Sequence, residues 1–250
     1  MFELSGRVVL VTGAGQGVGS GIARALAVQG AVVAVNDLDG ARAAQTVSSI
    51  EAAGGQARAT VFDVTDFDEV AGAVDDLKRT VGGVDVLVNN AGNGGAEGMR
   101  PAQFRDSDPK SWHGPIDVNL FGVLNCSRNV IGDMCDRGWG RVITIASGAG
   151  MVGLRIGVSA YGAGKGGAIG FMRHLAIESA RFGVTANTLA LGLMTNPGGP
   201  GVAEALARQI PVGRTGTPED IAALCVYLAS PEASWMTGQT IHINGGAVTS

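Results

Sequence analysis

Tyr161 and Lys165 are the two residues whose types and spacing most directly suggest proton chemistry. Residues four apart on a helix share a face, and this pair stands at the start of a predicted helix. A phenol with its ordinary pKa of about 10 is a poor base at neutral pH, but a neighbouring ammonium favours the phenolate. The pair therefore predicts a general acid/base. The alternative is a half-exposed pair of surface side chains.

A glycine-rich turn at residues 13–19 (GAGQGVG) joins the apolar run 8–11 to an apolar-periodic segment that ends at Gly30. This order predicts a buried strand, a tight turn and a helix. Because glycine has no Cβ, such a turn can come close to a pyrophosphate, and the amides at the helix start favour the anion. Val18 departs from the G-x-G-x-x-G pattern, so an ordinary tight turn is the alternative.

Asp37 follows the second apolar run, residues 31–36, about 20 positions beyond the glycine turn. An acidic residue at the carboxyl end of that strand is suited to hydrogen bonding with an adenosine ribose. The alternative is that Asp37 caps the next helix, a role that Asp39 would serve equally well.

The remaining segments alternate between strand and helix with short turns, which predicts right-handed crossovers and a parallel sheet. We therefore expect one α/β domain over residues 1–250, a doubly wound Rossmann-type sheet of about seven strands with helices on both faces. Further strands are predicted at 57–62, 84–88 and 141–145, and helices at 40–53, 66–80, 109–136 and from 161 onward.

Composition excludes several classes of protein. With 46% hydrophobic and 16% charged residues the chain is not of a disordered type, and a net charge of −4 argues against nucleic-acid partners. The sequence shows neither a signal peptide nor an apolar run of about 18 residues, so we expect a cytoplasmic protein without a membrane partner. Neither the cysteines nor the histidines have metal-ligand spacing, so no metal site is expected; they are Cys126, Cys135, Cys225, His113, His174 and His242.

Taken in order, several motifs resemble those of the short-chain dehydrogenase/reductase family, from about residue 5 to residue 246. The motifs are T-G-x-x-x-G-x-G at 12–19, Asn89-Asn90-Ala91-Gly92, Asn119, Ser147, Tyr161-x-x-x-Lys165, the segment 214–222 (RTGTPEDIA), Thr237-Gly238-Gln239 and Asn244-Gly245-Gly246.

The resemblance implies four catalytic residues. Tyr161 would be the general acid/base at an alcohol or carbonyl oxygen, and Lys165 would bind the nicotinamide ribose and lower the pKa of the tyrosine. Ser147 would hydrogen-bond the substrate oxygen, and Asn119 would hold a water of the proton relay. Among the cofactor contacts, Asp63 and Val64 would lie at the adenine and Asn90 at the adenosine-side ribose. The full implied cofactor set is Gly13, Gln16, Gly17, Val18, Gly19, Asp37, Asp63, Val64, Asn90, Ala91, Gly92, Tyr161, Lys165, Gly192, Thr195 and Asn196.

Some positions depart from the family pattern. Ala146 replaces the first serine of a common Ser-Ser pair, and Tyr161 lies 14 positions after Ser147, one more than expected, so the intervening loop should bulge. Leu191 stands before Gly192 where proline is usual. Asn196 stands where a threonine often contacts the nicotinamide amide, with Thr195 just before it. The Gly/Pro-rich stretch 196–201 predicts a hinged substrate lid within residues 193–212.

The leading hypothesis is an oxidoreductase that transfers a hydride between NAD(H) and a secondary alcohol or ketone. A 3-oxoacyl-thioester reductase, a catalytically silent nucleotide-binding regulator, and an enzyme that uses this site for epimerisation or dehydration are the alternatives. NAD is expected rather than NADP because the Asp37 charge would oppose a 2′-phosphate, although Arg42 could offset it.

A homotetramer is expected because Gly162, Gly166 and Gly170 recur every four residues along the helix of Tyr161. Such a stripe lets another helix approach closely, and the family commonly pairs this helix across a two-fold axis. The alternative is that the stripe packs within one subunit.

Overall fold

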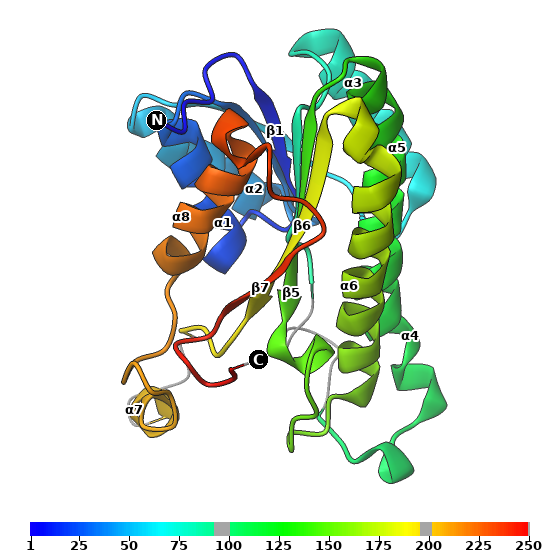
Figure 1. The fold of residues 1–250 in the computed structure, drawn as a ribbon, viewed down its shortest axis with the longest axis vertical. Coiled ribbons are helices and arrows are strands. Elements are labelled where there is room, and N and C mark those ends of the chain that lie inside the picture. Colours follow the sequence, from blue (N-terminus) through cyan, green and yellow to red (C-terminus); the bar gives the residue numbers. More distant parts are fainter. Residues whose placement is uncertain (93–100, 196–201, 250) are drawn as a thin grey trace.

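The computed structural model describes residues 1–92, 101–195 and 202–249, which form a seven-stranded parallel sheet in the order β3-β2-β1-β4-β5-β6-β7 (Figure 1). This order confirms the predicted doubly wound α/β fold. The strands are β1 (Val8–Val11), β2 (Val32–Asn36), β3 (Gln56–Thr60), β4 (Val86–Asn89), β5 (Gly140–Ser147), β6 (Val184–Leu191) and β7 (Thr240–Ile243).

Helices cover both faces of the sheet, with α1, α2 and α8 on one side and α3, α5 and α6 on the other (Figure 1). Side chains of a strand alternate between these layers. In β1, Val9 and Val11 pack in the core beneath α1 and α8, whereas Leu10 packs in the core on the other face. The helices are α1 (Gly17–Val28), α2 (Gly40–Ala52), α3 (Phe67–Thr80), α4 (His113–Ile116), α5 (Gly122–Asp136), α6 (Ser159–Ser179), α7 (Val202–Ala207) and α8 (Pro218–Ala229).

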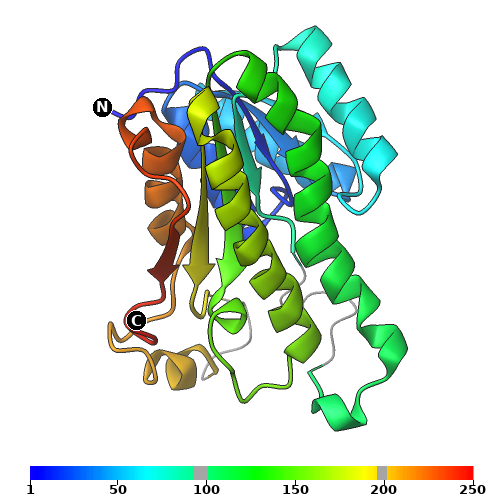
Figure 2. The same cartoon turned by 45° about the vertical axis from the view of Figure 1, so that its right-hand side comes forward.

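The carboxyl ends of the strands gather at one end of the molecule, where parallel sheets bind ligands. In Figure 2 the arrowheads of β6 (yellow) and β7 (dark red) point toward α7 and the C-terminus. The β5–β6 register places Ser147 opposite Leu191, directly before Gly192. The register thus brings two of the predicted site positions to the same edge.

The third and fourth predicted strands are each two residues shorter at one end. The fourth strand begins at Val86 rather than at residue 84, and just before it the Asp85 carboxylate accepts a 3.0 Å hydrogen bond from the Val8 amide at the start of β1. The third ends at Thr60 rather than at residue 62. Beyond it, the Asn36 side chain replaces the ladder by donating to the carbonyls of Thr60 and Phe62, at 3.1 and 3.0 Å.

The prediction of one helix over 109–136 is wrong. The segment contains a 3₁₀ turn at Pro109–Ser111, the short α4, a π-helical turn at Asp117–Phe121, and then α5. Pro115 has no amide hydrogen to donate within a helix. The Pro115 carbonyl accepts a 2.8 Å hydrogen bond from the Asn119 side chain. This side chain competes with backbone amides for the carbonyl, and the π-helical turn occurs at this point.

The cysteines differ in environment. Cys126 and Cys225 are buried and Cys135 is half-buried, and burial raises the pKa of the Cys126 thiol to about 12. A thiol with so high a pKa carries almost no thiolate at neutral pH. Within residues 1–92, 101–195 and 202–249, none of the helices has the length and hydropathy of a membrane span. The same residues include no group of three His, Cys, Asp or Glu side chains placed to hold a metal ion.

Candidate active site

The glycine turn connects β1 to α1 through backbone conformations that favour glycine. Gly13 and Gly17 have φ angles of +60° and +55°. A Cβ on Gly13 would lie 2.8 Å from the Ala91 Cα, and one on Gly19 would collide with the Asn90 side-chain nitrogen. Gln16, at the N-cap of α1, makes no side-chain capping bond, which leaves the first helical amides available to an anion. The turn therefore fits a pyrophosphate.

The end of β4 is bonded to this turn. The Thr12 hydroxyl accepts hydrogen bonds from the amides of Asn90 and Ala91, each at 3.0 Å. The Asn90 side chain donates to the carbonyls of Thr12 and Gly13, at 2.9 and 3.0 Å. Asn90 thus orients the turn through its amide nitrogen, and its contact with a ribose stays a prediction. Thr12 was missed at the sequence level, although a hydroxyl directly before Gly13 was the available signal.

Asp37 lies at the carboxyl end of β2 and is 6% exposed. One carboxylate oxygen accepts from the Gly15 amide at 3.0 Å, and the other accepts from the Asp39 amide at 3.0 Å and lies 3.3 Å from the Arg42 guanidinium. Asp39, not Asp37, caps α2 by accepting from the amides of Ala41 and Arg42. The carboxylate of Asp37 is therefore fixed beside the glycine turn, with Arg42 next to it.

The predicted adenine contacts follow β3. The Asp63 carboxylate accepts from the amide and hydroxyl of Thr65, both at 2.8 Å. Val64 is buried, and its carbonyl accepts a 3.0 Å hydrogen bond from the Asn125 side chain on α5. These bonds hold the loop after β3 at the same edge of the sheet as Asp37.

Tyr161 and Lys165 occupy the first turns of α6, as predicted. Lys165 is 4% exposed, its ammonium donates to the Ile145 carbonyl at 2.7 Å, and Nζ lies 6.0 Å from the centroid of the Tyr161 ring. Burial lowers the pKa of Lys165 to about 8. Burial also raises the pKa of Tyr161, and a hydrogen bond with Ser147 opposes that rise. The structure thus brings three of the four predicted catalytic residues together.

Ser147 is held against α6 because the residues that follow it, 148–150, cross the helix at close range over Gly162 and Gly166. We call this contact the glycine crossing. A Cβ on Gly162 would lie 2.8 Å from the Ala149 carbonyl oxygen, and one on Gly150 would lie 2.9 Å from the Gly166 nitrogen. Two of the three stripe glycines therefore pack against residues 148–150 of their own chain, the alternative given for the stripe. The same crossing places Ser147 next to Tyr161, despite the longer loop between them.

Asn119 completes the group from the π-helical turn, where it is fully buried. A Cβ on Gly92 would lie 2.8 Å from the Asn119 side-chain oxygen and 3.1 Å from Lys165 Nζ, so these three residues converge. Gly92 belonged to the predicted cofactor set, and its lack of a side chain is what leaves this space open.

The last predicted contacts lie after β6. The Gly192 amide donates to the Ile243 carbonyl at 2.9 Å, and a Cβ there would lie 2.7 Å from the Asn244 Cα. The Thr195 hydroxyl donates to the Gly216 carbonyl at 2.9 Å and lies 2.9 Å from the Thr215 hydroxyl. Thr195, near the start of the predicted lid, is thus bonded to residues that follow the lid in the sequence. Asn196 and the stretch 196–201 lie outside the described residues.

A family model described as enoyl-(acyl carrier protein) reductase matches residues 13–248. The chain belongs to the short-chain dehydrogenase/reductase family. Its motifs, from the glycine turn to Tyr161 and Lys165, lie along one edge of the sheet. The chain is accordingly an oxidoreductase that acts on CH–OH or C=O groups with a nicotinamide cofactor.

Similar proteins of this family span nearly the full length. Nodulation protein G of Azospirillum brasilense is 38% identical over 248 residues, covering 97% of this chain and 98% of that protein. Acetoacetyl-CoA reductase of Cupriavidus necator is 37% identical over 245 residues, covering 96% and 97%. The crystal structure of a gluconate 5-dehydrogenase from Burkholderia cenocepacia, in complex with NADP and tartrate, aligns with a TM-score of 0.90 at 33% identity, covering 98% and 96%.

Proposed function

We propose that this enzyme oxidises a secondary alcohol, or reduces the corresponding ketone, with Tyr161 as the general acid/base. The observation that carries the proposal is the buried Lys165 ammonium, bonded to one neutral carbonyl and 6.0 Å from the Tyr161 ring. With a pKa of about 8, Lys165 keeps most of its charge at pH 7. Such a cation beside a phenol favours the phenolate and offsets the effect of burial on Tyr161.

Each site residue then has a task. When bound, the nicotinamide cofactor would supply the hydride chemistry that interconverts the alcohol and the ketone. Tyr161 takes the hydroxyl proton in the first direction and gives it back in the second. Ser147 holds the substrate oxygen next to Tyr161, and Asn119 holds the water that carries the proton onward. The glycine turn and the first amides of α1 hold the pyrophosphate, Asp37 holds the adenosine ribose, and Asp63 and Val64 flank the adenine.

NAD is the proposed cofactor rather than NADP. At ~4 Å and an effective dielectric constant of ~20, each phosphate charge near the Asp37 carboxylate costs roughly 4 kcal/mol before screening. Even a quarter of that cost, about 1 kcal/mol, gives about a fivefold preference for each charge, and a phosphate with a charge of about −1.5 brings the preference for NAD to about tenfold. Arg42 lies 3.3 Å from one oxygen of Asp37 and reduces this repulsion without cancelling it, because the guanidinium also pairs with Asp39.

Substrate class has two candidates. A simple secondary alcohol or ketone is the first, and a 3-oxoacyl thioester is the second, supported by the 37% identity to an acetoacetyl-CoA reductase. Tyr161 and Lys165 are both present, which argues against a silent nucleotide-binding regulator. Epimerisation or dehydration at the same site would release no reduced nicotinamide, which distinguishes those reactions by assay.

A homotetramer in the cytoplasm, with a lid at 193–212, completes the proposal. Gly162 and Gly166 pack on their own chain, so they do not support contact with a second subunit. Of the three glycines of the stripe, only Gly170 still supports it, because an added Cβ there would meet no atom within 4 Å. Most soluble oligomers are homo-oligomers with closed symmetry, and tetramers with D₂ symmetry are among the common forms. Sedimentation at micromolar concentration checks this part, and a monomeric mass contradicts it.

The test is a hydride-transfer assay. Purified protein is mixed with NAD or NADP and a panel of secondary alcohols, and in reverse with ketones and acetoacetyl-CoA, while the absorbance of the reduced nicotinamide is followed. We expect turnover with at least one substrate and a kcat/KM about tenfold higher with NAD. Cofactor binding without hydride transfer to any compound would overturn the catalytic proposal. An equal or better kcat/KM with NADP would overturn the cofactor assignment alone.

A further inference from the structure

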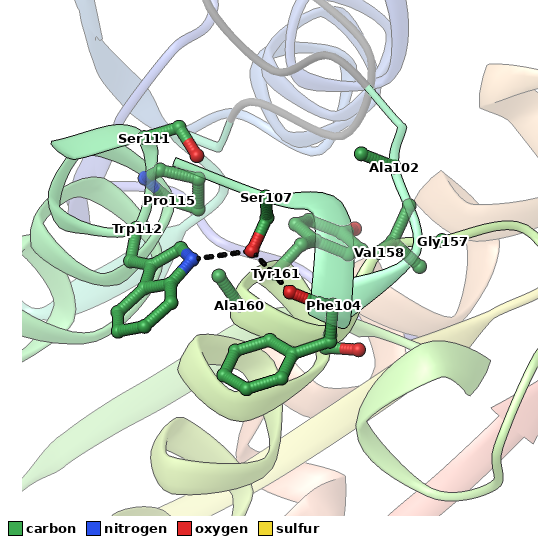
Figure 3. Close-up of a pocket in the computed structure, with 11 residues that line it drawn as sticks. Ala102, Phe104, Ser107, Ser111, Trp112, Pro115, Gly157, Val158, Ala160 and Tyr161 are labelled. Atoms are coloured by element: carbon green, nitrogen blue, oxygen red, sulfur yellow. Dashed lines mark hydrogen bonds between the residues drawn. The ribbon is translucent and has the colours of Figure 1, made fainter. Parts of the chain in front are cut away.

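Residues 101–116, here called the brace segment, lie against the start of α6 (Figure 3). At one end the Ala102 amide donates to the Gly157 carbonyl at 2.9 Å. Gly157 has a φ of +67°, and a Cβ there would lie 2.7 Å from the Ala102 carbonyl oxygen and 2.8 Å from the Ala102 nitrogen. Both the backbone conformation and the close approach therefore require glycine at this position.

A second close contact fixes the other end. A Cβ on Gly164 would lie 2.9 Å from the Pro115 carbonyl oxygen and 3.1 Å from the Asn119 Cβ. The brace segment is thus attached to the chain four residues before Tyr161 and three residues after it. Between the two attachments it has to pass alongside the first turn of α6, on which Tyr161 lies.

Aromatic side chains occupy the space between the attachments. Phe104 and Trp112 stack with ring centroids 5.0 Å apart at 21°. Trp112 donates to the Ser107 hydroxyl at 2.9 Å, and that hydroxyl donates to the Phe104 carbonyl at 2.8 Å. These three residues and Tyr161 line one small cavity of about 40 Å³ (Figure 3). The ring of Tyr161 and the aromatic side chains of the brace segment therefore line a common space at the first turn of α6.

We propose that the brace segment positions the Tyr161 hydroxyl at the reacting oxygen. Gly157 acts as a positioning residue, because its lack of a side chain lets Ala102 and the rest of the segment pack against the start of α6. The inference rests on the proposed acid/base role of Tyr161. The hydroxyl is the tyrosine atom that lies farthest from the backbone. A small rotation of the first turn of α6 therefore displaces this hydroxyl more than it displaces the backbone. A displacement of about 1 Å can cost 10²-fold in rate.

The primary test is Gly157→Ala. We expect kcat to fall by roughly 10- to 100-fold, while the KM and Kd of the nicotinamide cofactor change by less than about twofold. If Gly157 served only the stability of the fold, Gly157→Ala would lower the melting temperature without lowering kcat at unchanged cofactor affinity. A parallel loss of cofactor affinity would overturn the proposal, because it would indicate general damage to the site.

Two glycines serve as matched controls. Gly153→Ala lies in the same loop, and Gly138→Ala has a φ of +69° at the opposite end of the sheet; an added Cβ meets no atom within 4 Å at either. Gly153→Ala should resemble the wild type. Gly138→Ala should lose stability through backbone strain and keep kcat within about twofold. A fall in kcat for Gly138→Ala equal to that of Gly157→Ala would overturn the proposal.

A second variant avoids backbone strain and decides the matter if Gly157→Ala does not fold. Trp112→Ala removes the stack with Phe104 and the hydrogen bond to Ser107, and we expect kcat about 3- to 10-fold lower at unchanged cofactor affinity. If both variants fold and keep wild-type kcat while Tyr161→Phe is inactive, the brace proposal fails alone. If Tyr161→Phe itself keeps its turnover, the proposed function fails.

Discussion

Around the glycine turn, the polar groups of Thr12, Asn90 and Asp37 are satisfied by backbone amides and carbonyls within 3.0 Å. At the other half of the site, the Lys165 ammonium is buried against one neutral carbonyl, and burial lowers its pKa to about 8. The first half is fixed by glycine geometry and hydrogen bonds between strands. The second half holds a charge whose burial is only partly compensated.

The difference separates two ways of preparing a site. A turn whose bonds already exist is preorganised for a pyrophosphate at little further cost. Burying a cation costs folding free energy. Such a group is typical of sites where a neighbouring side chain changes its protonation state during the reaction. Substitutions in the first half should therefore change mainly cofactor affinity, and those in the second half should change proton transfer, with Lys165 also affecting cofactor affinity through the nicotinamide ribose.

The largest effect is expected for Tyr161→Phe, which keeps the ring and removes the acid/base. Turnover should fall by roughly 10²–10⁴-fold, while the cofactor binds as before, because the turn half is untouched. Steady-state kinetics and a fluorescence titration with reduced cofactor measure the two quantities. Near-normal turnover on a genuine substrate would falsify the acid/base assignment.

The second effect concerns the charge on Lys165. The pKa of Lys165 is about 8 in the folded protein, whereas the ordinary pKa of a lysine, which applies to the unfolded chain, is 10.5. Between these values the unfolded chain carries more protons, so this group makes the free energy of unfolding rise with pH, by at most about 3 kcal/mol. Below pH 8 both states are protonated and the contribution is constant.

Lys165→Met removes that dependence. Denaturant titrations of the two proteins from pH 7 to 10.5 should give unfolding free energies whose difference changes in this window. A difference independent of pH would show that the ammonium is not destabilised by burial. The variant should also weaken cofactor binding and turnover, since the charge beside Tyr161 is lost.

In the turn half, Gly19→Ala forces a methyl group against the Asn90 side-chain nitrogen and the Gly13 carbonyl. We expect a loss of about 1–3 kcal/mol in stability together with weaker cofactor binding. Gly72→Ala is the matched control, a helical glycine in α3 with no atom within 4 Å of the added Cβ. It should gain about 0.5–1 kcal/mol and bind the cofactor normally. Equal behaviour of the two variants contradicts the close approach at Gly19.

The smallest effect is a change of cofactor preference in Asp37→Asn. Removing the carboxylate releases Arg42 from its 3.3 Å pair and should raise the ratio of kcat/KM for NADP to that for NAD by about tenfold. Asp39→Asn serves as the control, because asparagine still caps α2 while one neighbouring charge is removed. If Asp39→Asn changed the ratio of kcat/KM for NADP to that for NAD more than Asp37→Asn did, Asp39 and not Asp37 would discriminate between the cofactors, which would contradict the assignment.

Much of the architecture was predictable, because it depends on local signals. Apolar runs such as Val8–Val11 are followed within two residues by glycine or a polar turn residue, and the alternation of strands and helices permits few topologies. The face shared by Tyr161 and Lys165 follows from helical spacing alone. Asp37 could be placed at a strand end, but its bond to Gly15 depends on a turn 22 residues earlier in the sequence.

What could not be predicted depends on contacts between distant segments. Nothing in the sequence around Gly157 indicates that Ala102 will lie against it, and the stripe at Gly162 and Gly166 has the same spacing whether it packs on its own chain or on another. The π-helical turn is accompanied by a hydrogen bond from the Asn119 side chain to the Pro115 carbonyl, which helical periodicity does not reveal. Partner choice at such contacts is decided by three-dimensional packing.

The glycine crossing on α6 also restricts how this enzyme can be made more heat-resistant. Replacing helical glycine by alanine is a common route to stabilisation. In α6 that route is closed at Gly162 and Gly164, where a backbone oxygen of another segment lies within 3 Å of the added methyl group, and it is restricted at Gly166, where the Gly150 carbonyl oxygen would lie 3.3 Å away. Gly170 has open space around it, so a thermostability screen along this helix should enrich alanine there and retain glycine at the other three positions.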